Sequence, residues 1–246
     1  KRRFLRSCPL CIATSESRAR IMKKTLPIAG DPVVVYNSPR RNVASGTPGA
    51  WRERIGLADE DVLGVYAGGL GTNRYVPELV DSVRDWPDNV HLLIAGYARE
   101  QILKDLENQV KLERRVHIFG HQPSAFPLLE DADFGVSLFD LDPEHRNLLH
   151  RGLASNKIFE NLAFGNPVVV TKNSETMDLI ECRYKCDQCI ETHTPAGIAD
   201  RINALLWDPA RFAEMKKQAR KAHLEETYFE RRFEHVCQFL WNVAEC

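Results

Sequence analysis

Three stretches of the sequence combine glycine with polar or charged residues in a way that suits an anionic ligand. The first, Gly68-Gly69-Leu70-Gly71-Thr72-Asn73-Arg74, directly follows an apolar run. Glycines let a backbone approach an anion closely, and a guanidinium presents a fork of N–H donors that matches phosphate oxygens. The spacing fits neither the dinucleotide fingerprint G-x-G-x-x-G nor a P-loop. A tight turn with a surface arginine is the alternative interpretation.

The second stretch, Gly120-His121-Gln122-Pro123, follows the apolar run VHIF. Because glycine has no side chain, backbone groups there can face a flat ligand such as a nucleobase. His121 could stack on that base or contact a phosphate. An exposed loop histidine that contacts no ligand is the alternative.

The third stretch reads LASNKIFENLAFGNPVVV at positions 153–170. Ser155 or Asn156 is a suitable N-cap for a helix that ends at the glycine nine or ten residues later. Lys157 then lies in the first turn, where a cation opposes the helix dipole unless an anion neutralises it. Glu160 lies one turn on, and its carboxylate can accept two hydrogen bonds from a ribose diol. A Lys157–Glu160 surface pair, worth roughly a few tenths of a kcal/mol, is the alternative.

Short apolar runs alternate with amphipathic segments around these stretches, which is typical of βα units and a parallel sheet. In a unit spanning residues 46–208 we expect strands at Val62–Ala67, Val90–Ala95, Val116–Phe119, Phe134–Phe139, Pro167–Thr171 and Gln188–Glu191. We expect helices at Trp51–Ile55, Val76–Trp86, Ala98–Leu112, Ala125–Asp131, Ser155–Phe164, Thr176–Arg183 and Ala196–Leu206. The predicted fold class is α/β, with a doubly wound, Rossmann-like parallel sheet. Ligands of such sheets bind beyond the carboxyl ends of the strands, where the three polar stretches lie.

The segments on either side of this unit have patterns of their own. Residues 1–45 contain a predicted strand at 9–15, a helix at 16–26 and a strand at 32–36. A linker rich in Ser, Gly and Pro follows at 42–50 and marks a domain boundary. Residues 209–246 are predicted to be helical. Their apolar side chains recur every three or four positions, at Phe229, Phe233, Val236, Leu240 and Val243. We expect this apolar face to dock on a domain.

The overall composition is that of a globular protein and excludes several classes. The 246 residues include 33 basic and 34 acidic side chains, so the balanced charge argues against nucleic acid as a partner. No apolar run approaches the roughly 20 residues that span a bilayer. The basic N-terminus lacks the apolar stretch of a signal peptide. Seven cysteines, an odd number, favour a reducing compartment. We therefore expect a cytoplasmic protein, with peripheral membrane association of the full-length protein left open.

Two cysteine clusters have the spacing of zinc ligands. They are Cys8 with Cys11, and Cys182, Cys186 and Cys189. The clusters lie far apart in the sequence, and cysteines in apolar strands are commonly small buried residues. We expect no metal site, and a cysteine–metal interaction domain remains an alternative.

The segment SNKIFENLAFGNPVV at 155–169 resembles the pattern P-N-K-hydrophobic-F-E-Y-hydrophobic-A-x-G-x-P-V-V of the group 1 glycosyltransferases. VYAGGL at 65–70 and LLIAG at 92–96 are similar to that family's first two strand ends. HIFG at 117–120, followed by LLEDAD at 128–133, is similar to its base-binding region. VYNSP at 35–39 is similar to the stretch where the family's chain leaves the N-terminal domain. The family consists of retaining enzymes of the GT-B architecture, with two facing Rossmann-like domains.

The resemblance implies that residues 46–208 bind a nucleoside diphosphate sugar as donor, and that no cofactor is needed besides this substrate. Glu160 would bind its ribose, while Arg74 and Lys157 would hold the diphosphate and act in catalysis. Further contacts would come from Gly68, Gly69, Gly71, Gly120, His121, Ser155 and Asn156. The acceptor would be a saccharide, a lipid-linked saccharide or another acceptor.

The resemblance also assigns the ends of the chain. Residues 1–45 would be the end of an N-terminal, acceptor-binding domain, and 209–246 would be C-terminal helices that cross back onto both domains. We therefore expect a piece of a longer protein, which binds nucleotide but transfers sugar poorly by itself.

Two positions depart from the family's pattern. Gly152 stands where an acidic residue eight positions before Glu160 is usual, and only Arg74 stands where an arginine and a lysine are common. A non-catalytic nucleotide-sugar-binding module is therefore an alternative. An NAD-dependent enzyme is disfavoured, because the glycine fingerprint and an acidic residue after VHLLIA are both missing. The donor sugar, the base, the acceptor and the oligomeric state are left open.

Overall fold

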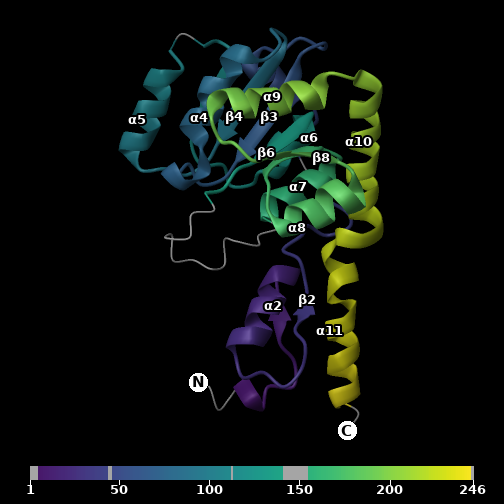
Figure 1. Ribbon diagram of the computed structural model, residues 1–246. Coiled ribbons are helices and arrows are strands. Elements are labelled where there is room, and N and C mark those ends of the chain that lie inside the picture. The colour runs from purple at the N-terminus through teal and green to yellow at the C-terminus, as the bar shows by residue number, and fades with distance from the viewer. Residues whose placement is uncertain (1–4, 44–45, 112, 141–154, 245–246) are drawn as a thin grey trace.

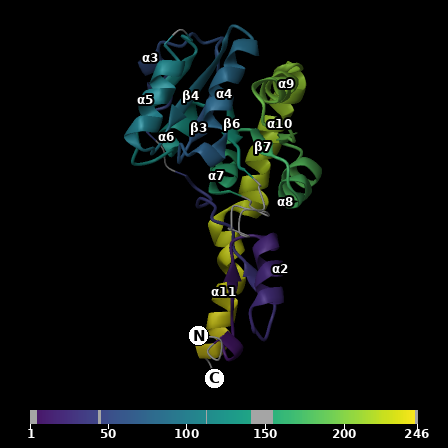
Figure 2. The same cartoon turned by 60° about the vertical axis from the view of Figure 1, so that its left-hand side comes forward.

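The computed structural model describes residues 5–43, 46–111, 113–140 and 155–244. The chain forms a larger and a smaller unit, and the long helix α11 (Phe229–Ala244) runs from the first along the second (Figure 1). The larger unit is built on a six-stranded sheet, and the smaller on a two-stranded one. The two units lie end to end, so the molecule is elongated (Figure 2).

The sheet of the larger unit is parallel throughout, with strand order β5-β4-β3-β6-β7-β8. Its strands are β3 (Val62–Ala67), β4 (Val90–Ala95), β5 (Val116–Phe119), β6 (Phe134–Ser137), β7 (Val168–Thr171) and β8 (Asp187–Ile190). The order reverses between β3 and β6. That reversal is the topological switch point at which doubly wound sheets bind ligands. The predicted Rossmann-like α/β fold is confirmed.

Helices cover both faces of this sheet. They are α3 (Ala50–Ile55), α4 (Val76–Ser82), α5 (Glu100–Gln109), α6 (Phe126–Asp131), α7 (Asn156–Phe164), α8 (Ser174–Thr176), α9 (Pro195–Leu206) and α10 (Pro209–Ala222). Alternate residues of a strand point to opposite faces. Leu63 and Val65 of β3 therefore pack with Trp51 of α3, while Tyr66 packs with Val76 of α4. Burial on both faces is the reason that these strands are nearly continuous apolar runs.

Several predicted elements of the larger unit have other bounds than expected, among them the predicted helix Val76–Trp86, whose α-helical part ends at Ser82. Strand β6 ends at Ser137 rather than Phe139, because Phe139 N–H donates to the Thr171 side-chain Oγ1 (2.8 Å) instead of a strand carbonyl. The predicted helix Thr176–Arg183 is a π-helical segment, Met177–Tyr184, that follows the short helix α8. Helix α5 is shorter than predicted, and Leu112, the predicted end, lies outside the described residues.

The smaller unit consists of β1 (Ile12–Ala13), α2 (Glu16–Thr25) and β2 (Val33–Val34). Both strands are shorter than predicted, because each has only the other as a partner in the described structure. Two backbone N–H groups of the smaller unit bond to a carboxylate of the larger one. Glu16 N–H (2.8 Å) and Ser17 N–H (3.2 Å) both donate to the Glu175 side chain of α8. This buried carboxylate also stabilises the positive end of helix α2.

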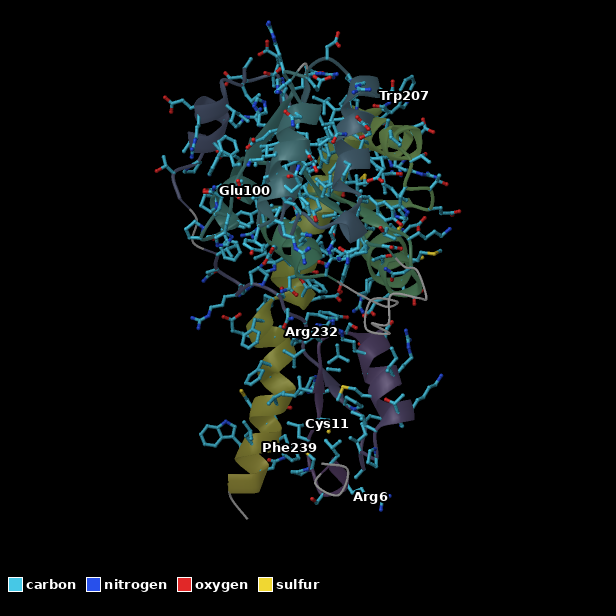
Figure 3. All side chains as sticks on the ribbon, turned by 90° about the vertical axis from the view of Figure 1, so that its left-hand side faces the viewer. Arg6, Cys11, Glu100, Trp207, Arg232 and Phe239 are labelled. Atoms are coloured by element: carbon cyan, nitrogen blue, oxygen red, sulfur yellow. The ribbon has the colours of Figure 1, made fainter. Side chains whose placement is uncertain are left out.

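Helix α11 docks over only part of its predicted apolar face. Val236 is buried at 3% exposure, whereas Leu240 is 55% exposed. The Val243 side chain lies outside the described part of the chain. Figure 3 labels Arg232 and Phe239 along this helix, and the Arg232 guanidinium lies 4.4 Å from the centroid of the Tyr36 ring. The docking prediction is wrong for Leu240, because the two short strands of the smaller unit do not cover the whole helix.

Neither a membrane span nor a metal site is evident in these elements. No described helix is long and apolar enough to cross a membrane. The two cysteine clusters do not form a ligand set, since no three His, Cys, Asp or Glu side chains of the described residues converge on one metal position. Cys186 is instead buried in a core cluster, and Cys182 is exposed.

A pair of histidines on neighbouring strands is expected to make the fold less stable in acid. His91 Nδ1 of β4 lies 3.2 Å from His117 Nε2 of β5. Burial lowers the pKa of both histidines, and the Asp61 carboxylate, 3.8 Å from His91, only opposes this effect. The unfolded chain, with ordinary histidine pKa values of about 6.5, then binds more protons than the folded chain. The free energy of unfolding should therefore fall as the pH drops below about 6.5.

Urea unfolding at pH 7.5 and pH 5.5 tests this prediction, with His117→Phe as the matched variant. The stability of that variant should depend less on pH than that of the wild type. Equal pH dependence of the two proteins would show that the pair does not govern acid stability.

Candidate functional site

The three polar stretches meet at the carboxyl edge of the sheet. They follow β3 and β5 and begin helix α7, and they enclose a cavity of about 340 Å³. Its polar and glycine lining includes Gly68, Gly69, Tyr97, His121, Gln122 and Glu160. A volume of this size lies at the lower end of the range for small-molecule sites, about 300–1,000 Å³. Gly120 is not part of the lining, but its carbonyl accepts a hydrogen bond from Gln122 Nε2 (3.1 Å).

The ends of β3 and β4 approach each other so closely that they require glycine. A Cβ atom on Gly96 would lie 1.7 Å from the carbonyl oxygen of Gly68. Gly68 itself has φ +145°, a conformation that side chains disfavour. Glycine at position 96 therefore lets the turn after β3 lie against the end of β4, and both segments line the cavity.

Lys157 extends from the first turn of α7 to a position beside the glycine turn. Its Nζ donates a hydrogen bond to Tyr66 Oη (3.1 Å) and lies 4.3 Å from the centroid of the Tyr66 ring. Burial lowers the pKa of Lys157 to about 7, and the charge of Arg74 acts in the same direction. The Glu160 carboxylate opposes this shift, but it is outweighed. The surface-pair interpretation of Lys157 and Glu160 does not describe this lysine, which is half-buried and bonded to Tyr66.

Arg74 places a second cation near Lys157. The Arg74 guanidinium lies 4.4 Å from the centroid of the Phe139 ring, and Lys157 Nζ lies 5.6 Å from the same centroid. Among the described residues, no carboxylate forms an ion pair with Arg74. The aromatic ring stabilises both cations but does not cancel their mutual repulsion. An anion bound between them would relieve it.

The N-terminus of α7 adds backbone donors to these cations. Ser155 is the N-cap, with extended backbone angles, and its side chain makes no capping hydrogen bond. The first N–H groups of the helix are therefore left without a cap side chain, the state in which a helix N-terminus accepts an anion. Asn156 is the first helical residue and is exposed.

Glu160 supplies the carboxylate of the cavity. Burial raises its pKa, and the nearby Lys157 charge opposes the increase. No group of the described residues donates a hydrogen bond to it, so both oxygens are available to a ligand. Helix α7 holds Glu160 in place through the adjacent Phe159, whose ring stacks at 4.5 Å on Tyr36, a residue that follows β2 and packs in the core of the larger unit.

Arg74 and Glu160 lie on the same edge of the sheet. Arg74 lines a second cavity of about 510 Å³, which shares Gly69 and Tyr97 with the cavity that contains Glu160. Gly71 lines this second cavity and not the first. The two side chains thus line neighbouring cavities, and their contact with one elongated ligand stays a prediction.

The family comparison matches this unit. A family model described as glycosyl transferases group 1 matches residues 64–208, more than half of the chain. This chain belongs to the group 1 glycosyl transferases. The resemblance inferred from the sequence is thereby confirmed. No curated protein sequence matches the chain.

Several solved structures, glycosyltransferases among them, share the fold. HepE of Anabaena, determined with UDP-glucose, is 20% identical, with a TM-score of 0.77 over 97% of this chain and 65% of its own. A glycosyltransferase from Rickettsia africae is 14% identical, with a TM-score of 0.76 over 97% and 65%. WaaG, of lipopolysaccharide biosynthesis, is 13% identical, with a TM-score of 0.68 over 92% and 61%. The chain thus spans less than two thirds of the length of each.

Three aromatic residues of this candidate site were missed in the sequence analysis. Tyr66 holds the Lys157 ammonium, Phe139 lies beneath both cations, and Tyr97 stands at the shared mouth of the two cavities. Tyr97 alone had a local signal, because it directly follows a strand-end glycine. Tyr66 and Phe139 lie within apolar runs, where nothing distinguishes them from core residues.

Proposed function

We propose that this protein is a glycosyltransferase that takes its sugar from a nucleoside diphosphate sugar bound at the carboxyl edge of the six-stranded sheet. The observation that carries the proposal is the pair of cations, Arg74 and Lys157, placed beside a glycine turn and an available carboxylate. HepE, which has the same fold, was determined with UDP-glucose and with UDP. These ligands support the same class of donor here.

In this proposal each part of the donor has its own contacts. The base lies against the loop of Gly120 and His121, and the ribose diol donates to Glu160. The diphosphate lies over the glycine turn, Gly68 to Gly71, near the α7 N-terminus formed by Ser155 and Asn156. The distribution follows the residue chemistry: the carboxylate accepts from hydroxyl groups, while the cations and the helix N-terminus bind the anion.

The proposed chemistry uses the two cations on the leaving group. As the glycosidic bond to the diphosphate breaks, negative charge builds on the departing oxygen. Arg74 and Lys157 would stabilise that charge more strongly in the transition state than in the ground state. An arriving diphosphate raises the pKa of Lys157 again, since a nearby anion favours the ammonium form. The transfer would retain the anomeric configuration, and it would need no metal or other cofactor.

A thermal-shift screen against UDP, GDP, ADP and their sugars tests the donor class. One nucleoside diphosphate and its sugars should raise the melting temperature, because a ligand that binds only the folded state stabilises it. We expect little sugar transfer by these 246 residues, and turnover by a protein with a complete acceptor-binding domain. NMR of the product anomer then tests retention. A screen without any shift would contradict the proposal.

Arg74→Ala should weaken binding of the selected nucleoside diphosphate by at least about tenfold, since a hydrogen bond to a charged group contributes roughly 1.5–3 kcal/mol. Isothermal titration calorimetry measures the change. The control is Arg114→Ala, which removes the same charge from an exposed position before β5, at the opposite edge of the sheet. If the two variants bind the nucleoside diphosphate with equal affinity, Arg74 does not contact the diphosphate.

The second candidate is a non-catalytic nucleotide-sugar-binding module. Gly152, at the position where the resemblance leads one to expect an acidic residue, favours it and lies outside the described residues. Nucleotide binding without turnover in the full-length protein would select this candidate.

The proposal extends to the acceptor and the compartment. The acceptor would be a saccharide or a lipid-linked saccharide, and TarM, a structural neighbour determined with Fondaparinux, alpha-GlcNAc-glycerol and UDP, supports a saccharide. The compartment would be a reducing one such as the cytoplasm, because seven cysteines, an odd number, do not suit a disulfide framework.

A further inference from the structure

A second cavity lies at the same edge of the sheet. The nucleotide contacts proposed above involve only three of its lining residues, Gly69, Gly71 and Arg74, which lie on its border with the nucleotide site. The second cavity lies between the segment 69–74 after β3 and the segment 97–102, which follows β4 and begins α5. Its volume of about 510 Å³ is larger than that of the nucleotide cavity. The hydrogen bond from Leu70 N–H to the Tyr97 carbonyl (2.9 Å) fixes the two segments to each other.

The charge of this cavity is positive. Arg74 and Arg99 line it, and none of its lining residues is acidic. Within the described chain, neither guanidinium forms an ion pair. The acid next to Arg99, Glu100, pairs instead with Lys104 at 2.6 Å (Glu100 is labelled in Figure 3). Two unpaired guanidinium groups facing one cavity favour a carboxylate or a phosphate, which each can bind through two parallel hydrogen bonds.

The remaining walls suit a ring rather than a bare anion. Leu70, Ala98 and Ile102 provide apolar surface, and Asn73 offers both a donor and an acceptor for hydroxyl groups. The Tyr97 side chain, 73% exposed, stands where this cavity meets the nucleotide cavity. An exposed aromatic ring offers an apolar face with a polar tip, to which a ligand that is part apolar and part polar can bind.

We propose that this second cavity binds an acidic sugar unit, a glycosyl group that carries a carboxylate or a phosphate, with its anionic group on Arg99, while Arg74 at the border of the cavity contacts the diphosphate. The sugar ring lies against Tyr97 and the apolar wall. Binding of the acidic sugar does not depend on the proposed function; only the question whether this sugar belongs to the donor or to the acceptor rests on it. Because the two cavities share Gly69 and Tyr97, the acidic unit can belong either to the donor or to the acceptor.

The first experiment measures binding of glucuronic acid and glucose 6-phosphate against glucose, by ligand-observed NMR at low ionic strength. Both acidic sugars should bind at least tenfold more tightly than glucose. Arg99→Gln should abolish this preference, while the control Arg114→Gln, which removes an exposed arginine elsewhere, should retain it. Equal binding of glucose, or an Arg99→Gln variant with unchanged preference, would overturn the proposal.

The second experiment identifies the origin of the acidic unit. If the donor carries it, UDP-glucuronic acid should bind at least tenfold more tightly than UDP-glucose to the wild type, and this difference should vanish in Arg99→Gln. If the acceptor carries it, the two nucleotide sugars should bind alike, and glucuronic acid or glucose 6-phosphate should still bind when UDP saturates the protein. No acidic preference in either arm would overturn the proposal.

UDP alone separates this inference from the proposed function. The proposed donor is wrong if UDP, GDP and ADP all fail to bind while the acidic sugars bind to the wild type and not to Arg99→Gln. The acidic-sugar site in the second cavity is then still supported. If UDP binds with equal affinity to the wild type and Arg99→Gln, and acidic sugars show no preference, the nucleotide site stands and this inference is wrong.

Discussion

Lys157→Met is expected to weaken nucleoside diphosphate binding by at least about tenfold while making the ligand-free protein more stable at neutral pH. The variant removes an ammonium that would donate to the diphosphate, a charged interaction worth roughly 1.5–3 kcal/mol. It also removes the cation beside Arg74, and methionine keeps the unbranched stem that lies beside Gly68 and Tyr66. A loss of affinity together with a gain in stability would show that the two cations repel each other in the ligand-free protein. It would also show that the bound anion relieves this repulsion.

The pH dependence of this effect has a definite sign. The pKa of Lys157 is about 7 in the folded protein and about 10.5 in an unfolded chain. Between these values the unfolded chain binds more protons, so this lysine makes the free energy of unfolding rise with pH. The stability gained by Lys157→Met should therefore be largest at pH 7 and below, and should vanish near pH 10.5. In the wild type, diphosphate affinity should fall as the pH rises above about 7.

Urea unfolding at pH 6.5 and pH 10 and calorimetric titration with UDP at pH 6 and pH 8.5 measure these changes. The control is Lys221→Met, an exposed lysine on α10, which should alter neither quantity. If Lys157→Met keeps its UDP affinity and its stability matches that of the control, the lysine does not have the position described here.

Gly96→Ala is expected to destabilise the fold by at least about 3 kcal/mol, the upper end of the usual cost of overpacking, or to prevent folding. The added Cβ would lie 1.7 Å from the Gly68 carbonyl oxygen, which belongs to the backbone and cannot move by a side-chain rotation. The glycine turn would have to leave the end of β4. Any folded fraction should therefore bind nucleoside diphosphate poorly, because the turn borders both cavities.

Two matched variants separate this steric effect from a general intolerance of alanine at strand ends. Gly69→Ala and Gly120→Ala place the same methyl group where no other atom lies within 4 Å. Their stabilities should stay within about 0.5 kcal/mol of the wild type, as for ordinary surface substitutions. Chemical denaturation compares the three variants, and equal stability of all three would mean that the β3 and β4 ends are not in contact.

Much of the fold could be predicted because buried parallel strands have a strong local pattern. The bounds of β3, β4 and β5 agree with those expected from the runs VLGVYA, VHLLIA and VHIF. The predicted lengths of β6, β1 and β2 were too long. A strand ends where its hydrogen bonds to the neighbouring strand end, and the sequence of one strand does not show that point. The exposed end of α11 was also unpredictable, because an apolar helix face does not show how much surface is available to cover it.

The sequence by itself determined which groups are available at the site: the glycines after β3, one arginine, one lysine at the start of a helix and one carboxylate a turn later. Only the tertiary structure decided how they act. The bond from Lys157 to Tyr66 joins residues 91 positions apart, and the contact of Gly96 with Gly68 joins two strand ends. Local patterns record the neighbours along the chain, whereas desolvation and charge repulsion depend on neighbours in space. The perturbed lysine and the cavity between the two arginines therefore emerge only once the strands have come together.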